Sequence, residues 1–162
     1  EKGVGTTFVI RVPFKIDLDA DKREESKDVS EKSIKGMHVL LAEDNELNME
    51  IAEFMLQNEG AEVTKAWNGQ EIVELFRKSE AGEFDVILMD IMMPIINGYE
   101  ATKRIRSLDR EDAKKIPIIA MTANAFTEDR IRAKEAGMDE HVAKPIDVEL
   151  LIKVIHKLVK HN

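Results

Sequence analysis

The chain has 162 residues and no cysteine, and its 24 lysines and arginines face 32 aspartates and glutamates, which gives a formal charge of −8. The absence of cysteine excludes disulfide frameworks, thiolate zinc sites and cysteine nucleophiles, and the acidic balance disfavours binding to nucleic acid through the phosphate backbone. No apolar run approaches the ~20 residues of a membrane span and no signal peptide opens the chain, so we expect no membrane contact.

The N-terminal segment differs from the rest of the chain in charge. Residues 1–36 hold eight acidic and eight basic residues, whereas residues 37–162 hold 24 acidic and 16 basic ones. Residues 6–14 (TTFVIRVPF) predict a strand, which alone cannot bury its apolar face and would belong to a domain upstream. Residues 17–35 contain twelve charged residues among nineteen, which predicts a solvated linker. Because the first residue is Glu1 rather than methionine, we interpret the chain as a fragment or a processed protein.

From residue 37 onward, short apolar runs alternate with longer amphipathic stretches. Five such units predict a parallel α/β sheet with helices on both faces and right-handed crossovers. The apolar runs are residues 39–42, 62–66, 86–89, 116–121 and 141–143. Helical spacing predicts core-facing positions at Leu47, Ile51, Phe54 and Met55 in the first helix, at Ile72, Leu75 and Phe76 in the second, and at Leu151, Val154, Ile155 and Leu158 in the last.

Polar residues follow the apolar runs at the points where functional sites form in open parallel sheets. They are Glu43, Asp44, Asp90, Thr122 and Lys144. Taken singly, Asp44 and Thr122 also suit helix N-caps, and a lone lysine is usually solvated. Taken together, clustered carboxylates repel one another unless a cation compensates. Ligands that are all oxygen suit a hard divalent ion, so we expect Mg²⁺ as the cofactor.

This constellation suits phosphoryl chemistry. A carboxylate beside Mg²⁺ and a lysine can attack a phosphoryl group and form an acyl phosphate. The metal and Lys144 would neutralise charge on the phosphoryl oxygens, and the Thr122 hydroxyl would donate a hydrogen bond to one of them.

Residues 37–160 closely resemble the receiver domain of two-component signalling. The resemblance rests on the motifs LLAEDN (40–45), ILMDIMMPIINGYEA (87–101), IIAMTANA (118–125) and HVAKPID (141–147), in this order and at strand ends. It implies a doubly wound (βα)5 flavodoxin-like sandwich, with a parallel sheet of order 2-1-3-4-5 and five helices.

The resemblance also implies a role for each site residue. It implies that Asp90 is the phosphoacceptor and that Mg²⁺ is bound by Glu43, Asp44, Asp90 and the backbone carbonyl of Met92. It further implies a switch hydroxyl at Thr122 and a phosphate-pairing lysine at Lys144. The peptide bond before Pro145 is expected to be cis. Three departures from the usual pattern concern four positions. Asn97 replaces the aspartate before the turn glycine, His141 replaces the switch aromatic, and Met92 and Asn124 stand where the family tunes dephosphorylation.

Residues 3–14 (GVGTTFVIRVPF) resemble the final glycine box and last strand of a histidine-kinase ATP-binding domain. Together with the receiver motifs they indicate the C-terminal end of a hybrid sensor histidine kinase. We expect a remnant of the ATP-binding domain at 1–16, a charged linker at 17–36 and the receiver at 37–162. Most of the ATP site and the domain with the phosphorylatable histidine are missing, so this piece would accept phosphoryl groups, with autodephosphorylation left open, and would not phosphorylate itself from ATP.

The leading hypothesis is a phosphorelay receiver, which takes a phosphoryl group from phosphohistidine and passes it to a histidine phosphotransfer partner. The donor would be the chain's own kinase, the location the cytoplasmic part of a parent protein, and weak homodimerisation stays open. Two alternatives stay open. The first is a receiver-like docking module without phosphorylation. The second, an aspartyl-phosphate phosphohydrolase, generally needs an aspartate two residues after the nucleophile, where this chain has Met92.

Overall fold

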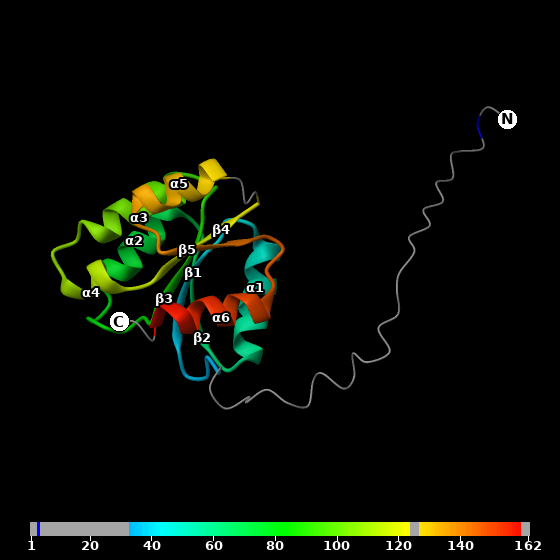
Figure 1. Cartoon of the computed structure of the whole chain (residues 1–162), viewed down its shortest axis with the longest axis horizontal. Helices are drawn as coiled ribbons and strands as arrows, with labels where there is room; N and C mark the ends of the chain where they lie inside the picture. Colours follow the sequence, from blue (N-terminus) through cyan, green and yellow to red (C-terminus); the bar gives the residue numbers. More distant parts are fainter. Residues whose placement is uncertain (1–2, 4–32, 124–126, 160–162) are drawn as a thin grey trace.

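The computed structural model describes Gly3 and residues 33–123 and 127–159 (Figure 1). The predicted strand remnant and most of the predicted linker lie outside the described residues and stay predictions. Within the described part of the chain, no helix is both long and apolar enough to cross a membrane.

A five-stranded parallel sheet forms the centre of the domain. Its strand order is β2-β1-β3-β4-β5, as the resemblance predicts. Each strand is only four or five residues long, and every residue of β3 and β4 is buried, because helices cover both faces of the sheet. The strands are β1 (His38–Ala42), β2 (Glu62–Ala66), β3 (Val86–Asp90), β4 (Ile118–Thr122) and β5 (Glu140–Ala143).

The helices lie in two layers, one on each side of the sheet (Figure 1). The described residues form α1 (Glu46–Asn58), α2 (Gly69–Lys78), α3 (Gly98–Arg106), α4 (Glu111–Lys115), α5 (Thr127–Ala136) and α6 (Val148–Val159). The resemblance predicts five helices, and the structure adds the one-turn helix α4 between α3 and β4. The side chain of Ala113 in α4 is fully buried, so α4 closes the core at that end.

Alternating residues of the strands belong to two separate hydrophobic clusters, one on each face of the sheet. In β3, for example, Ile87 packs with α2 and α3, whereas Leu88 packs with α1 and α6. This alternation assigns α2, α3, α4 and α5 to one face of the sheet and α1 and α6 to the other. The predicted core positions in α2 and α6 are confirmed, since each is buried or packed against one of the clusters.

The predicted core face of α1 is wrong for three of its four residues, whereas the fourth, Met55, is half-buried. Leu47, Ile51 and Phe54 are 64%, 44% and 65% exposed. The residues of α1 that are buried against the sheet are Met49, Ala52 and Leu56. Both sets have helical spacing, so periodicity alone cannot choose between two apolar stripes on one helix. In the folded domain, the stripe of Leu47, Ile51 and Phe54 therefore faces solvent.

The packed part of the chain begins before the predicted boundary at residue 37. Ile34 lies in the predicted linker, yet its side chain is fully buried with the cluster that contains α1 and α6. Two backbone hydrogen bonds hold this segment, from Gly36 N to Gly60 O (2.8 Å) and from Met37 N to Ile34 O (3.0 Å). One apolar residue among many charged ones is too weak a compositional signal to mark such a boundary.

Candidate phosphoryl-transfer site

The carboxyl ends of four strands bring the predicted polar residues to one edge of the sheet. Asp90 is the last residue of β3 and Thr122 the last of β4. Glu43 and Asp44 follow β1, and Lys144 follows β5. The end of β4 and the segment after β5 are joined, since the backbone N–H of Lys144 donates to the carbonyl of Thr122 (2.8 Å).

Lys144 joins two of the carboxylates directly. Its Nζ lies 2.8 Å from Oδ2 of Asp90 and 2.5 Å from Oε2 of Glu43. The lysine side chain is 19% exposed, and the carboxylate side chains are 7% and 3% exposed. The alternative of a solvated lysine is therefore wrong for Lys144, because its ammonium group compensates two nearly buried negative charges.

Asp44 completes an acidic cluster with these two residues. One carboxylate oxygen from each of Glu43, Asp44 and Asp90 lies within 4.8 Å of the others. Asp44 is not the N-cap of α1, because the neighbouring Asn45 side chain accepts the hydrogen bond from Asn48 N (3.0 Å). Asp44 is exposed and does not cap the helix. Three convergent oxygen donors fit a hard divalent cation such as Mg²⁺.

The electrostatics of the cluster differ between its acidic and basic members. Burial raises the pKa of the Asp90 carboxyl, and the charge of Glu43 raises it further, whereas the hydrogen bond and charge of Lys144 act in the opposite direction. Burial alone would lower the pKa of Lys144, but its hydrogen bonds with Asp90 and Glu43 outweigh this and raise it. Lys144 therefore stays cationic beside the carboxylates.

The loop between β3 and α3 shapes the surroundings of Asp90. The backbone N–H of Met92 donates to Asp90 Oδ1 (3.1 Å), while the Met92 side chain is 76% exposed. Gly98 allows the end of this loop to pass close to the backbone of Asp90, because a Cβ at Gly98 would lie 2.2 Å from the Asp90 carbonyl oxygen. Asn97 caps α3 by accepting from Glu100 N (2.9 Å), so the departure from aspartate keeps the cap.

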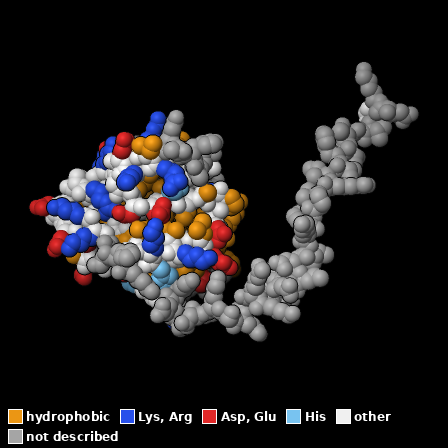
Figure 2. Space-filling view, in the orientation of Figure 1, with side chains coloured by type: hydrophobic (Ala, Val, Ile, Leu, Met, Phe, Trp, Pro, Cys, Tyr) orange, Lys and Arg blue, Asp and Glu red, His pale blue; other side chains and the backbone are white. Residues whose placement is uncertain are grey.

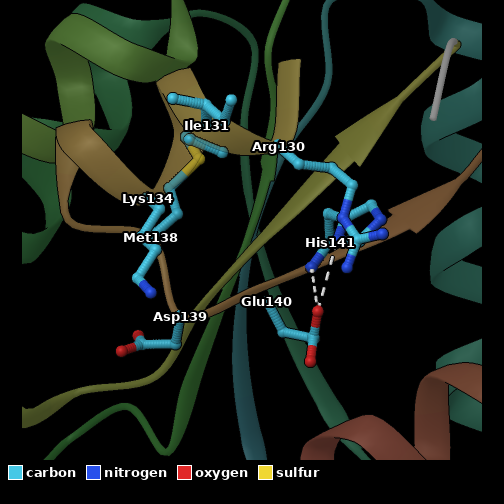
Figure 3. A pocket seen from close by; sticks show the side chains of 8 residues that line it. Arg130, Ile131, Lys134, Met138, Asp139, Glu140 and His141 are labelled. Carbon is cyan, nitrogen blue, oxygen red and sulfur yellow. Dashed lines mark hydrogen bonds and ion pairs between the residues drawn. The ribbon is translucent and has the colours of Figure 1, made fainter. Parts of the chain in front are cut away.

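His141, the predicted switch position, lies apart from the acidic cluster. It lines a pocket between α5 and β5, and its Nδ1 is 3.2 Å from Oε1 of Glu140 (Figure 3). The side chains of Arg130 and Lys134 reach this pocket from α5. None of the acidic cluster lines it. Thr122 is buried at the end of the neighbouring strand β4.

Two further features lie beside the acidic cluster. The Lys144–Pro145 peptide bond is cis, as the resemblance predicts. Asn48, which the sequence analysis did not single out, donates from Nδ2 to Glu43 Oε1 (3.0 Å). Its only sequence signal is its place in the first turn of a helix that follows the acidic pair, where hydrophobic periodicity says nothing about a polar residue.

Comparison with known proteins identifies the domain. Residues 39–156 match the family of response regulator receiver domains. The chain is 35% identical over 161 residues to histidine kinase 1 of Arabidopsis thaliana, with 81% of this chain covered, and 40% identical over 120 residues to hybrid signal transduction histidine kinase I of Dictyostelium discoideum, with 73% covered. It spans only 13% and 7% of the lengths of these two relatives.

Solved structures show the same fold. The receiver domain of sensor histidine kinase PA1611 from Pseudomonas aeruginosa, crystallised with magnesium coordinated in the active-site cleft, is 36% identical with a TM-score of 0.69, over 77% of this chain and 98% of that one. A receiver domain of Saccharomyces cerevisiae Ssk1, in complex with the histidine phosphotransfer protein Ypd1, is 27% identical with a TM-score of 0.67, over 78% and 90%. The chain therefore belongs to the response regulator receiver family and contains a receiver domain of two-component phosphorelay signalling.

Proposed function

We propose that Asp90 is the phosphoacceptor of this receiver domain and that a phosphohistidine is its donor. Mg²⁺ would be held by Glu43, Asp44, Asp90 and the backbone carbonyl of Met92, where it would supply positive charge for the phosphoryl oxygens. The observation that carries the proposal is the convergence of Asp90, Glu43 and Lys144 at one sheet edge, with Lys144 Nζ bonded to both carboxylates.

Phosphoryl transfer from phosphohistidine to Asp90 exchanges a P–N bond for a P–O bond. A carboxylate oxygen of Asp90 attacks phosphorus, the P–N bond to the donor imidazole breaks, and an acyl phosphate forms while the imidazole nitrogen takes up a proton from water. Lys144 stays cationic and stabilises the charge on the phosphoryl oxygens, and the Thr122 hydroxyl donates to one of them. The reverse reaction with the histidine of a phosphotransfer partner passes the group onward.

Labelling with acetyl phosphate in the presence of Mg²⁺ tests the acceptor. We expect intact-protein mass spectrometry to show one added phosphoryl group in the wild type and in Asp109→Asn, a control at an exposed turn. Asp90→Asn should show none. Labelling of Asp90→Asn at the wild-type level would overturn the assignment, and rapid multiple turnover of small phosphate esters would favour the phosphohydrolase alternative.

The exposed face of α1 supports a histidine phosphotransfer domain as the partner. Figure 2 shows hydrophobic side chains gathered at the edge of the domain over α1, where Leu47, Ile51 and Phe54 are exposed. A small pocket connects this face to the cluster, because Ile51 lines it together with Glu43 and Lys144. An apolar surface that continues into the acceptor site suits a partner that must bring a histidine to Asp90.

Phosphotransfer from a phosphorylated histidine phosphotransfer protein tests this surface. Phe54→Ala and Leu47→Ala should slow transfer from that protein about tenfold, because they remove apolar contact area, while acetyl phosphate labelling stays at the wild-type rate. Ile131→Ala serves as the matched control, since Ile131 is 54% exposed on α5, on the other face of the sheet. Equal transfer rates for all three variants would contradict docking at α1.

Thr122 and His141 form the proposed switch, which would pass phosphorylation to the surface of α5 and β5. The parent protein is proposed to be a hybrid histidine kinase with this domain in its cytoplasmic part, in keeping with the two kinase relatives.

A further inference from the structure

Both carboxylate oxygens of Glu43 accept hydrogen bonds. Oε2 accepts from Lys144 Nζ (2.5 Å), and Oε1 accepts from Asn48 Nδ2 (3.0 Å) and, at longer range, from the Asn45 backbone N–H (3.4 Å). The Glu43 side chain is only 3% exposed, so each of these donors replaces water that the carboxylate has lost. Oε1 thus receives a side-chain hydrogen bond from the Asn48 amide.

The start of α1 fixes Asn48 in this position. The Asn45 side chain accepts from the Asn48 backbone N–H (3.0 Å), which anchors the residue in the first turn while its own amide reaches back to Glu43. The same residue lines the small pocket beside Glu43 and Lys144. Helix capping and the orientation of the Glu43 carboxylate are thereby coupled through one residue, Asn48, by its backbone N–H and its side-chain amide.

We propose that Asn48 is a positioning residue for the divalent cation, which acts by fixing the Glu43 carboxylate. Asn48 donates a hydrogen bond to Oε1 of Glu43. The other oxygen, Oε2, is thereby left to bind either Lys144 or a cation that replaces the lysine. Partners behind a metal ligand commonly set metal affinity by 10- to 100-fold, because they hold the ligand in its binding orientation. This inference rests on the proposed function, since it requires the Mg²⁺ site at Glu43, Asp44 and Asp90.

Isothermal titration of the full chain with Mg²⁺ in the absence of any phosphodonor tests the inference. Asn48→Leu keeps the side-chain size and favours helix but removes the amide, and it should weaken Mg²⁺ binding by about tenfold or more. Asn58→Leu makes the same change at the far end of α1 and should bind like the wild type. Asn48→Ala is the second variant if Asn48→Leu fails to fold by circular dichroism. Affinity within twofold of the wild type would overturn the inference.

A double-mutant cycle separates positioning from a general structural effect. If Asn48 acts through Glu43, then Asn48→Leu should change the Mg²⁺ affinity by less than about twofold in a Glu43→Gln background, because the oriented carboxylate is already absent. An equal loss in both backgrounds would contradict the inference while leaving the metal site intact. A wild-type chain that binds no Mg²⁺ would instead contradict the proposed metal site itself, and the inference with it.

Discussion

Glu43 and Lys144 are 101 positions apart in the sequence, yet Lys144 Nζ lies 2.5 Å from Glu43 Oε2. The pair links the loop after β1 to the loop after β5. Lys144 Nζ also lies 2.8 Å from Oδ2 of Asp90 at the end of β3. The ammonium group thus lies among the carboxylates that we propose as metal ligands. Its positive charge compensates the nearly buried carboxylates of Glu43 and Asp90.

Removal of Lys144 should therefore make stability depend on Mg²⁺. We expect Lys144→Gln to lower the free energy of unfolding by about 3 kcal/mol, because two nearly buried carboxylates lose their counter-charge. Mg²⁺ should restore more stability in this variant than in the wild type, as measured by urea denaturation with and without the metal. Lys153→Gln is the control, since Lys153 and Glu149 form an exposed pair at 3.7 Å. Equal stability of the two variants would contradict the role of Lys144.

The two apolar stripes of α1 should differ sharply in stability measurements. Leu56→Ala should cost about 3 kcal/mol, because Leu56 is 2% exposed and its loss leaves a cavity in the core. Leu47→Ala should stay within about 0.5 kcal/mol of the wild type, because Leu47 is 64% exposed. Chemical denaturation of both variants measures the difference. A similar cost for the two would mean that α1 is rotated relative to the described packing.

Asp112 should contribute stability that disappears in acid. The hydrogen bonds of Arg110 lower the pKa of Asp112 to about 2 against partial burial, and the Gly82 N–H assists (3.0 Å). Because the folded-state pKa lies below the ordinary value of 3.8, the stabilisation is complete above about pH 4 and is lost as the pH falls toward 2.

Urea denaturation across this pH range measures the effect. Asp112→Asn should lower the free energy of unfolding by about 1 kcal/mol at neutral pH, after an allowance for solvent screening of the pair. The gap to the wild type should close between pH 4 and pH 2. Asp109→Asn, in the neighbouring exposed turn, should show no such pH-dependent gap, and a constant gap for Asp112→Asn would refute the linkage.

Ile95 should respond to substitution through its backbone. It is the one non-glycine residue with positive φ among the described residues (φ 71), and its side chain is 75% exposed. A β-branched residue is strained there, whereas asparagine tolerates this conformation. Ile95→Asn should therefore raise the free energy of unfolding by about 1 kcal/mol, measured by thermal or chemical denaturation. Ile95→Val keeps the branch and should bring no gain, so equal effects of the two changes would argue against backbone strain.

The fold class, the order of the elements and the polar residues at the strand ends could all be predicted from the sequence. Alternating apolar runs and amphipathic stretches carry that information locally, and the position of a residue after a strand predicts which sheet edge it reaches. The motifs around Glu43, Asp90 and Lys144 then indicated the receiver family before any distance was known.

Three features follow only from the packing of the folded chain. They are the apolar stripe of α1 that is buried, the start of the packed segment before residue 37, and the hydrogen bonds of Asn48 and Lys144 to different oxygens of Glu43. Each of these depends on contacts between residues that are distant in the chain or on one of two faces with equal periodicity. Local spacing is blind to both, because burial and hydrogen-bond partners are set by the neighbouring elements and not by the segment itself.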